Sequence, residues 1–379
     1  MVRHSLRIYC YLCMVLNMKK VFHIVTHFDV GGAERVAVNI AKSRTEGYEY
    51  HVVELVRAHS QFTKVFTNEL REAGIRYHRA HVPDVHFHYV FQRIAAIVFP
   101  LWFLPLMLKH RPAAVHCHTE MPDLAVWWFF TLFPRLLRRC KVVRTIHNTV
   151  LWTGLKNTGR RVERFFIRNG CNVAISQSVR DSYAKEYGQT PPIIYNGVEE
   201  TPQRKCELGG ATSVNILFAG RLEPQKGIST LIEIVKRLKD DGRFHFYIVG
   251  DGRLRPVVER EIGALPCVTL HAPIHGLAAC LSSFDYMLMP SEFEGLGLMS
   301  VEASLAGVPV IANMCPGLCE TLPPDWPLAV HGNSIDEYMD IFKTLEKRAN
   351  GSALVENAQT FARRMFSVRR MQEEYEKIY

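Results

Sequence analysis

Short apolar runs alternate with helical patterns through the first half of the chain. The run at 21–26 is continuous and predicts a buried strand, and the apolar spacing of 33–41 predicts a helix directly after it. Further buried strands are predicted at 50–56, 75–77, 114–118, 141–147, 172–175 and 193–195. Helical patterns separate most of these runs, and this alternation is typical of a parallel, doubly wound sheet.

The second half repeats the alternation. Strands are predicted at 214–219, 244–249, 268–270, 285–289, 308–312 and 328–330, and helices at 227–239, 254–262, 277–281 and 298–306. The stretch 199–213 contains Pro202, Gly209 and Gly210 with little periodicity, which predicts a linker. The tail 334–379 has a helical pattern, with Ser367 as the cap of a last helix at 368–379. The fold class is therefore α/β, with two Rossmann-like doubly wound domains.

Length and composition are consistent with two domains and narrow the choice of partner. The chain has 379 residues, 48% of them hydrophobic and 22% charged, which is enough for two α/β cores. Its formal charge of +9 favours an acidic partner such as nucleic acid, anionic lipid or a sugar nucleotide. The sequence shows no recognisable nucleic-acid motif and no stripe of alternating aromatic and basic residues, so we expect no nucleic-acid partner.

The cysteine spacing indicates thiols rather than disulfides or zinc ligands. Among ten cysteines, Cys10-x-x-Cys13 and Cys315-x3-Cys319 are paired in sequence, but no second pair lies at zinc spacing. A chain of this length does not depend on disulfides for a stable core. We therefore expect reduced, mostly buried cysteines in a cytosolic protein.

The stretch 290–312 combines a glycine loop with two acidic residues. It lies between two apolar runs, so the pattern is strand, loop, short helix, strand. Gly295 and Gly297 remove side chains from the loop and permit unusual dihedral angles, so backbone N–H groups can approach a phosphate where the helix begins. Glu294 and Glu302 would repel phosphate and more plausibly accept hydrogen bonds from ribose and hexose hydroxyls. The alternative is an ordinary acidic surface loop.

A basic pair follows the first strand of the second half. Arg221 can donate two hydrogen bonds to a phosphate and Lys226 adds a point charge, so together they could neutralise a diphosphate. The strand before them and Gly227 after them favour this interpretation over a solvated basic loop.

Histidines stand at the ends of two predicted strands in the first half. His116 and His118 close one strand and His147 closes another. Ligands collect at the carboxyl ends of open parallel sheets, so we expect these side chains to face a binding cleft. The alternative is histidines satisfied by backbone groups. The sequence shows no third ligand near His116 and His118, so we expect no metal site.

Three motifs in this order resemble the retaining glycosyltransferases of family 4 (glycosyl transferases group 1), which have the GT-B fold. They are Gly31-Gly32-Ala-Glu-Arg, the segment 220–227, and Glu294-x7-Glu302 inside Glu-Gly-Leu-Gly-Leu. The resemblance covers nearly the whole chain from Met18. It implies two Rossmann-like domains that face each other across a cleft: an acceptor domain at 18–198, a linker at 199–213, a donor-nucleotide domain at 214–365, and a helix at 366–379 that crosses back to the first domain.

The resemblance implies a hexose transfer from a nucleotide-diphosphate sugar, UDP- or GDP-linked, with retained configuration and without a metal or other cofactor. The acceptor would be a saccharide or a lipid-linked sugar in cell-surface polysaccharide or glycolipid synthesis. His147, which matches the family's cleft histidine, and Glu294 are the expected catalytic residues. The expected donor-binding residues are Gly31, Gly32, Arg221, Lys226, Gly295, Leu296, Gly297, Leu298 and Glu302.

Other functions remain open at this stage. A nucleotide-sugar epimerase shares the GT-B architecture but would normally lack this set of motifs, and a glycogen-phosphorylase-like enzyme would need a much longer chain. A non-catalytic nucleotide-binding regulatory module is the alternative from a different class. Turnover with a sugar nucleotide distinguishes this regulatory module from an enzyme.

Two kinds of segment bear on localisation. Residues 1–17 imitate a secretory signal without a cleavage site, so we expect an upstream false start or a loose extension. The apolar stretches 94–108 and 124–137 are interrupted by prolines, so we expect no spanning helix. The blocks 97–111 and 126–141 are rich in aromatic residues and end in basic clusters, which is typical of peripheral contact with an anionic membrane on its cytosolic face. Apolar helices packed under a sheet are the alternative.

Overall fold

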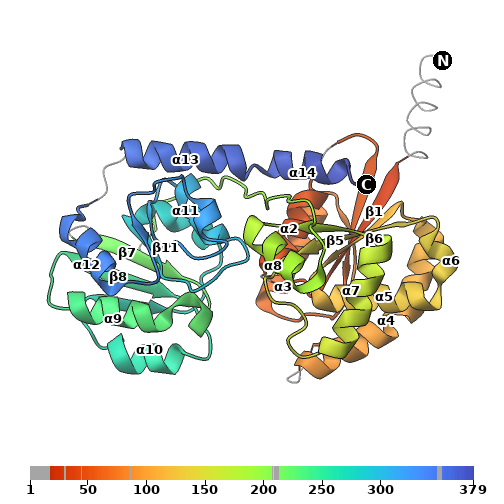
Figure 1. Ribbon diagram of the computed structural model, residues 1–379, viewed down its shortest axis with the longest axis horizontal. Coiled ribbons are helices and arrows are strands. Elements are labelled where there is room, and N and C mark those ends of the chain that lie inside the picture. Colours follow the sequence, from red (N-terminus) through yellow and green to blue (C-terminus); the bar gives the residue numbers. More distant parts are fainter. Residues whose placement is uncertain are drawn as a thin grey trace, which may run out of the picture. The chain divides into compact units, whose positions relative to one another are not determined.

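The computed structural model describes residues 18–29, 31–43, 45–84, 88–206, 208, 213–347 and 352–379. The extension predicted at 1–17, with Cys10 and Cys13, lies outside the described residues. The chain divides into two compact units (Figure 1). The N-terminal unit comprises the described residues up to Ile175, together with Val179–Gly197 and Val368–Tyr379, and the C-terminal unit comprises Ser176–Ser178 and Val198–Ser367.

The N-terminal unit is built on a six-stranded parallel sheet. Its strand order is β3-β2-β1-β4-β5-β6, so the chain reverses its direction of growth between β1 and β4. This is the order of a Rossmann-like sheet, whose ligands bind where the order reverses. The strands are β1 (Lys19–Val25), β2 (Tyr48–Glu54), β3 (Arg76–His78), β4 (Ala114–His118), β5 (Lys141–Ile146) and β6 (Gly170–Ala174).

Alternate residues of β1 show how the two faces of this sheet are covered. Phe22 and Ile24 join one core, which is filled from α4, α5 and α7. Val21 and Val25 join the opposite core, where α2, α3 and the C-terminal Tyr379 pack. The helices of this unit are α2 (Gly32–Ala41), α3 (Gln61–Glu72), α4 (His88–His110), α5 (Glu120–Leu132), α6 (Pro134–Leu137), α7 (Lys156–Asn169), α8 (Gln177–Tyr187) and α14 (Val368–Glu376).

The C-terminal unit repeats the topology. Its parallel sheet has the order β12-β11-β10-β7-β8-β9, so the reversal lies between β7 and β10. Its strands are β7 (Val214–Ala219), β8 (Phe244–Val249), β9 (Val268–His271), β10 (Tyr286–Met289), β11 (Val310–Asn313) and β12 (Ala329–Val330). Its helices are α9 (Ile228–Leu238), α10 (Arg255–Ile262), α11 (Leu298–Leu305), α12 (Ile335–Thr344) and α13 (Ala353–Met365), with short 3-10 turns η1 (Pro224–Lys226), η2 (Leu277–Ser283) and η3 (Cys319–Thr321).

The last helix belongs to the N-terminal unit although α13, directly before it, belongs to the C-terminal unit. Figure 1 shows α14 beside α2, and the two helices are in contact. Met371 and Tyr375 of α14 are buried with Val36 and Ile40 of α2. The predicted linker makes hydrogen bonds of its own, since the Arg204 N–H donates to the Ala279 carbonyl at 2.8 Å.

Two local expectations were wrong. Residues 193–195 form no strand, because Ile193 makes only a single bridge to Ala174. Helix α4 runs through Pro100 and Pro105 without a break. Each internal proline removes a backbone hydrogen bond at a cost of about 3 kcal/mol, but the buried Phe99, Phe103 and Met107 anchor this helix in the core.

The described cysteines are consistent with the expected thiols. Eight of them are free thiols. Burial raises the pKa of the thiol groups of Cys117, Cys140 and Cys315, among others.

Candidate functional site

In the C-terminal unit, the loops after β7 and β10 come together where the strand order reverses. Lys226, on the first loop, donates from Nζ to Oε1 of Glu294, on the second, at 2.6 Å. The Ser291 hydroxyl donates to the same oxygen at 2.7 Å. The Glu294 side chain is only 8% exposed and that of Lys226 is 19% exposed. The sequence suggested two separate binding groups, whereas the structure joins them in an ion pair.

Glycines allow these loops to pack closely. Gly227 has φ of 66° and lies so near the other loop that a β-carbon there would meet the Pro290 carbonyl oxygen at 1.8 Å. A β-carbon on Gly297 would come within 2.7 Å of the Leu318 side chain. Gly295 and Gly297 do not have positive φ angles. Gly297 nevertheless has φ of −41° and ψ of 68°, outside the helical and extended regions, so the expected unusual dihedral angles occur there, and close packing is a second reason for glycine at this position.

The amino terminus of α11 completes this arrangement. Gly297 is its N-cap without a side-chain hydrogen bond, and Leu298 is its first residue. The first N–H groups of a helix lack partners within it and favour an anion. Leu296 is buried beside them, and Glu302 lies half-buried on the second turn. Arg221 is exposed, and its guanidinium has no ion pair within the described residues, so it can turn to a ligand.

The N-terminal unit has a pocket of about 670 Å³ at its own reversal point. Residues that follow β1 and β4 line it, and α4 and the loop before α7 close it. The lining residues are Thr26, His27, Glu34, Gln92, Arg93, Thr119, Glu120, Met121, Trp152, Thr153, Gly154 and Leu155. An aromatic wall with carboxylates and hydroxyls suits a polyhydroxylated ligand.

Glu34 is the most perturbed acid of this pocket. Burial raises its pKa to about 7, and the neighbouring Asp29 adds to the shift. A β-carbon on Gly31 would lie 2.1 Å from the Glu34 carboxylate, so glycine makes room for this group. Gly31 itself is extended, with φ of −157°, and Gly32 is the exposed first residue of α2. Sequence reasoning included Glu34 in the glycine motif but assigned it no role.

A buried ion network holds the pocket wall. The Arg144 guanidinium donates to both oxygens of Glu163 at 2.7 Å and lies 2.7 Å from an oxygen of Asp123. Glu163 also accepts from the Trp152 indole N–H at 2.6 Å and from the Tyr183 hydroxyl at 2.7 Å. Trp152 is thereby fixed, although its φ of 58° is unusual for a large side chain. No sequence pattern indicated this network.

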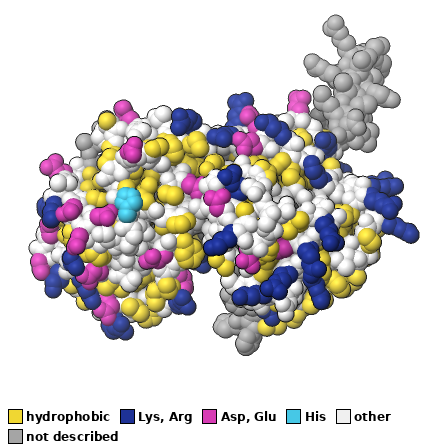
Figure 2. All heavy atoms as spheres, in the orientation of Figure 1, with side chains coloured by type: hydrophobic (Ala, Val, Ile, Leu, Met, Phe, Trp, Pro, Cys, Tyr) yellow, Lys and Arg dark blue, Asp and Glu magenta, His cyan; other side chains and the backbone are white. Residues whose placement is uncertain are grey.

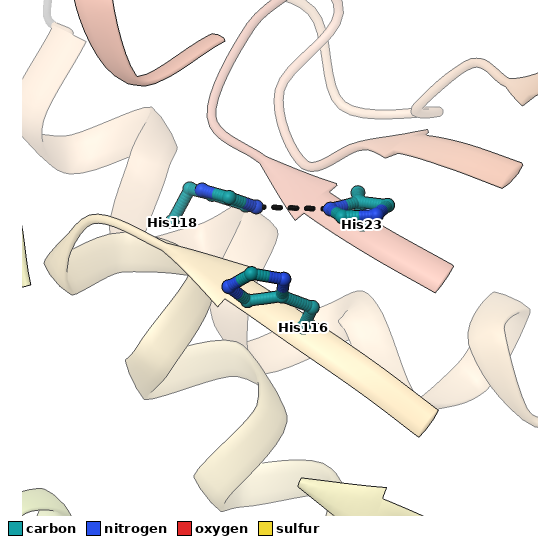
Figure 3. A group of neighbouring side chains, drawn as sticks. All are labelled: His23, His116 and His118. Carbon is teal, nitrogen blue, oxygen red and sulfur yellow. Dashed lines mark hydrogen bonds between the residues drawn. The ribbon is translucent and has the colours of Figure 1, made fainter. Parts of the chain in front are cut away.

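The predicted histidines form a chain that runs into the interior of the N-terminal unit. Nε2 of His147 lies 3.3 Å from Nδ1 of His118, whose Nε2 lies 3.0 Å from Nδ1 of His23 on β1. His116 lies beside them and bonds to Tyr379 and Thr145 (Figure 3). Burial lowers the pKa of His147 and of His23 to about 3 each, and lowers those of His116 and His118 well below the usual value.

Two expectations for the histidines were wrong. His116 and His118 are completely buried and do not reach a binding surface, because the C-terminal Tyr375 and Tyr379 pack over that face of the sheet. His23, which is distant in sequence, brings a third imidazole within 4.8 Å of both. A cross-strand neighbour of this kind follows from the register of β1 and β4, in which His23 pairs with His116.

Two family models match the chain, one in each half. The model described as Glycosyltransferase Family 4 matches residues 30–201, and the one described as Glycosyl transferases group 1 matches residues 213–348. The chain belongs to this glycosyltransferase family.

This glycosyltransferase has the same fold as several proteins of known structure. Anabaena HepE in complex with UDP and glucose superposes with a TM-score of 0.75 at 18% identity, over 95% of this chain and 99% of that one. Both proteins thus share the GT-B arrangement of two Rossmann-like domains.

Curated relatives match parts of the chain. An uncharacterized 41.2 kDa protein in the cps region of Klebsiella pneumoniae is 34% identical over 34% of this chain and 38% of its own length. A candidate colanic acid biosynthesis glycosyltransferase of Escherichia coli K12 is 30% identical over 30% of this chain and 31% of its own. The chain spans between 29% and 60% of the length of the first curated relatives it matches.

The glycosyltransferase brings the predicted residues together in two groups. Arg221 and Lys226 lie on the loop after β7, and the residues of the segment 294–298 and Glu302 lie after β10 of the same unit. Gly31, Gly32 and His147 lie after β1 and β5 of the N-terminal unit. The individual roles of these residues in binding and catalysis stay predictions.

Proposed function

We propose that this glycosyltransferase moves a hexose from a nucleotide-diphosphate sugar to a saccharide or lipid-linked acceptor, with retained configuration. The observation that carries the proposal is the site around the Lys226–Glu294 ion pair. At this site a lysine and a helix amino terminus, which suit a diphosphate, lie next to carboxylates, which suit sugar hydroxyl groups. The site lies at the reversal point of the strand order, where a Rossmann-like sheet binds its ligands.

The charges of this site define the donor. Arg221 and Lys226 bind the diphosphate and, together with the amino terminus of α11, take the part that a divalent metal plays in other transferases. Glu302 accepts from the ribose and Glu294 from the hexose. A UDP-linked donor is the first choice, supported by the HepE complexes with UDP and UDP-glucose, and a GDP-linked donor is the second.

The reaction replaces one carbon–oxygen bond by another on the same face of the sugar. The bond between the anomeric carbon and the leaving phosphate oxygen breaks as the acceptor oxygen bonds to that carbon. The acceptor proton passes to the departing phosphate oxygen, so no covalent enzyme intermediate is required. His147 binds the sugar while charge develops.

The pocket of the N-terminal unit is proposed to bind the acceptor. Trp152 offers an apolar face to a sugar ring, and Glu34, Glu120 and Thr153 offer hydrogen-bonding groups. The acceptor belongs to cell-surface polysaccharide or glycolipid synthesis, which the name of the Escherichia coli relative supports.

Helix α4 is proposed to bring this unit to the cytosolic face of an anionic membrane. Its window Val90–His110 is long and apolar enough to cross a bilayer by length and composition, and only 33% of it is buried. Val90, Ile94, Ile97, Leu101 and Leu108 recur at helical spacing and are 42–78% exposed. Figure 2 shows apolar atoms along the edge where α4 lies, with basic atoms nearer α6. Such a stripe fits a helix lying in the membrane interface.

The test is turnover with a panel of UDP- and GDP-hexoses. We expect hexose release or transfer from one of them, undiminished in excess chelator, with the anomeric configuration of the product retained in its proton NMR spectrum. Epimerised sugar nucleotide in place of transfer would make the chain an epimerase, and binding without turnover would make it a regulatory module.

A further inference from the structure

The proposed reaction uses only His147, but further buried histidines of the N-terminal unit lie in a row behind it. His147 follows β5, His118 ends β4 and His23 lies on β1, so three neighbouring strands each contribute one imidazole. Two hydrogen bonds join the three rings in a row, at 3.3 Å and 3.0 Å. Figure 3 shows the inner bond, with the His118 ring directed edge-on at His23.

Each ring of this row is neutral at physiological pH. Burial holds the pKa of His147 and of His23 at about 3 and lowers that of His118 well below its usual range. A neutral imidazole has one N–H donor and one acceptor nitrogen. The two hydrogen bonds must therefore run in the same direction, either inward from His147 to His23 or outward from His23 to His147.

The inner end of the row decides between these directions. Nε2 of His23 is buried and has no hydrogen-bond partner among the residues that the structure describes. If the bonds ran inward, this nitrogen would carry an unpaired N–H, whereas if they run outward it carries only an unused lone pair. Unpaired buried N–H groups are the rarer defect in proteins, since unmet acceptors are better tolerated.

The outward direction determines what His147 offers to a ligand. Nδ1–H of His118 then donates to Nε2 of His147, and the single proton of His147 lies on its own Nδ1. Within the described part of the chain this Nδ1 has no hydrogen-bond partner, and the His147 side chain is only half-buried. We propose that His118, supported by His23, positions His147 and fixes its tautomer, so that His147 presents an N–H donor to an oxygen of the sugar nucleotide.

This assignment rests on the proposed function, because the sugar nucleotide is the ligand of that reaction. It makes His147 a hydrogen-bond donor and excludes it as the general base. His118 and His23 become positioning residues that never touch substrate.

A metal ion is a poorer occupant of the same cluster. Nitrogens of His23, His116 and His118 lie within 4.8 Å of one another. However, both nitrogens of His116 already bond to Tyr379 and Thr145, at 2.6 and 2.7 Å. The three ligands are neutral, so a divalent cation would carry its whole charge into a dry interior.

The test compares three variants on β4. In ¹⁵N-histidine-labelled protein, the two ring nitrogens of His147 report which one is protonated, and a His147→Asn variant assigns the signals. We expect the Nδ1–H form in the wild type. His118→Leu removes the donor and should shift His147 towards Nε2–H, whereas His118→Asn retains an amide donor near the former Nδ1 and should restore Nδ1–H. His116→Asn, equally buried but outside the row, should leave the His147 signals unchanged.

Turnover supplies the second readout. A mispositioned catalytic group costs on the order of 10–100-fold. We expect His118→Leu to lose this factor in kcat, with KM for the sugar nucleotide changed by less than about twofold, and His118→Asn to recover most of it. His116→Asn shows whether a cavity alone lowers activity.

Three results would overturn the inference. They are an Nε2–H form of His147 in the wild type, the same His147 spectrum in the Leu and Asn variants at 118, and one equivalent of bound metal that is lost in His118→Leu. If the protein shows no turnover with any donor, the proposed function fails while the spectra still decide the tautomer.

Discussion

The two units have the same sheet order but different side chains at their reversal points. In the C-terminal unit, the partly exposed Lys226 pairs with the buried Glu294, and Arg221 is exposed. In the N-terminal unit the corresponding place has neutral histidines, a carboxyl group with a raised pKa and a buried ion network behind Trp152. One topology thus carries the Lys226–Glu294 pair in one copy and a pocket lined by hydroxyl, carboxyl and guanidinium groups in the other, because function lies in the loops and not in the sheet.

The largest effect is expected from breaking the buried network of the N-terminal unit. Arg144→Ala leaves the Glu163 carboxylate as an uncompensated buried charge, which costs about 3–5 kcal/mol, whereas burial already raises the pKa of Asp123 to about 8. Thermal or urea unfolding should show this loss. The exposed Arg237, which pairs with Glu233 on α9, is the control, and Arg237→Ala should cost less than about 1 kcal/mol. Equal losses of unfolding free energy in both variants would mean that the buried network stabilises the fold no more than an exposed ion pair does.

Breaking the Lys226–Glu294 ion pair of the C-terminal unit should lower turnover rather than stability. Lys226→Ala removes a charged hydrogen bond to the diphosphate worth roughly 1.5–3 kcal/mol, so turnover should fall by tens to hundreds of times. Lys236→Ala breaks another lysine–glutamate pair of the same unit, on exposed positions, and should keep full turnover. A Lys226→Ala enzyme as active as this control contradicts the assignment.

The acid of the N-terminal pocket gives a pH-dependent effect. Folding raises the pKa of Glu34 from 4.5 to about 7, so the folded protein binds this proton more tightly than the unfolded chain does. The wild type therefore loses stability as pH rises from 4.5 to 7, on the order of 2 kcal/mol after allowance for partial exposure.

Glu34→Gln tests this sign directly. The variant should match the wild type near pH 4.5, gain on it up to pH 7, and keep a constant advantage above pH 7. Unfolding midpoints measured across this range are the readout, and a stability difference that does not change with pH shows that Glu34 keeps an ordinary pKa.

The smallest effect is expected at the apolar stripe of α4. Leu101→Glu places a charge on the proposed membrane contact, which should weaken binding to anionic vesicles by about 1 kcal/mol or more. Val65→Glu changes an exposed apolar residue of α3 and is the control. Flotation at low salt measures both variants. Wild-type protein that stays with the soluble fraction would favour a soluble acceptor.

Periodicity predicted most of the fold, since all twelve described strands lie near their expected positions and both sheets are parallel. The segment 193–195 was missed because an apolar run at a sheet edge can end after one bridge. The meeting of the two loops could be predicted because Arg221, Lys226 and Glu294 follow strands in sequence. Glu34, Trp152 and His23 could not, because burial and cross-strand register, which the linear pattern does not contain, give them their surroundings.

The most direct measurement of the central claim is UDP binding to the Arg221→Ala variant by calorimetry. A lost charged hydrogen bond of roughly 1.5–3 kcal/mol corresponds to about 10–100-fold weaker binding. We predict this loss in Arg221→Ala and wild-type affinity in Arg237→Ala, with both variants folded. Equal UDP affinity in the wild type and in Arg221→Ala would contradict the assignment of the C-terminal unit as the site that holds the donor diphosphate.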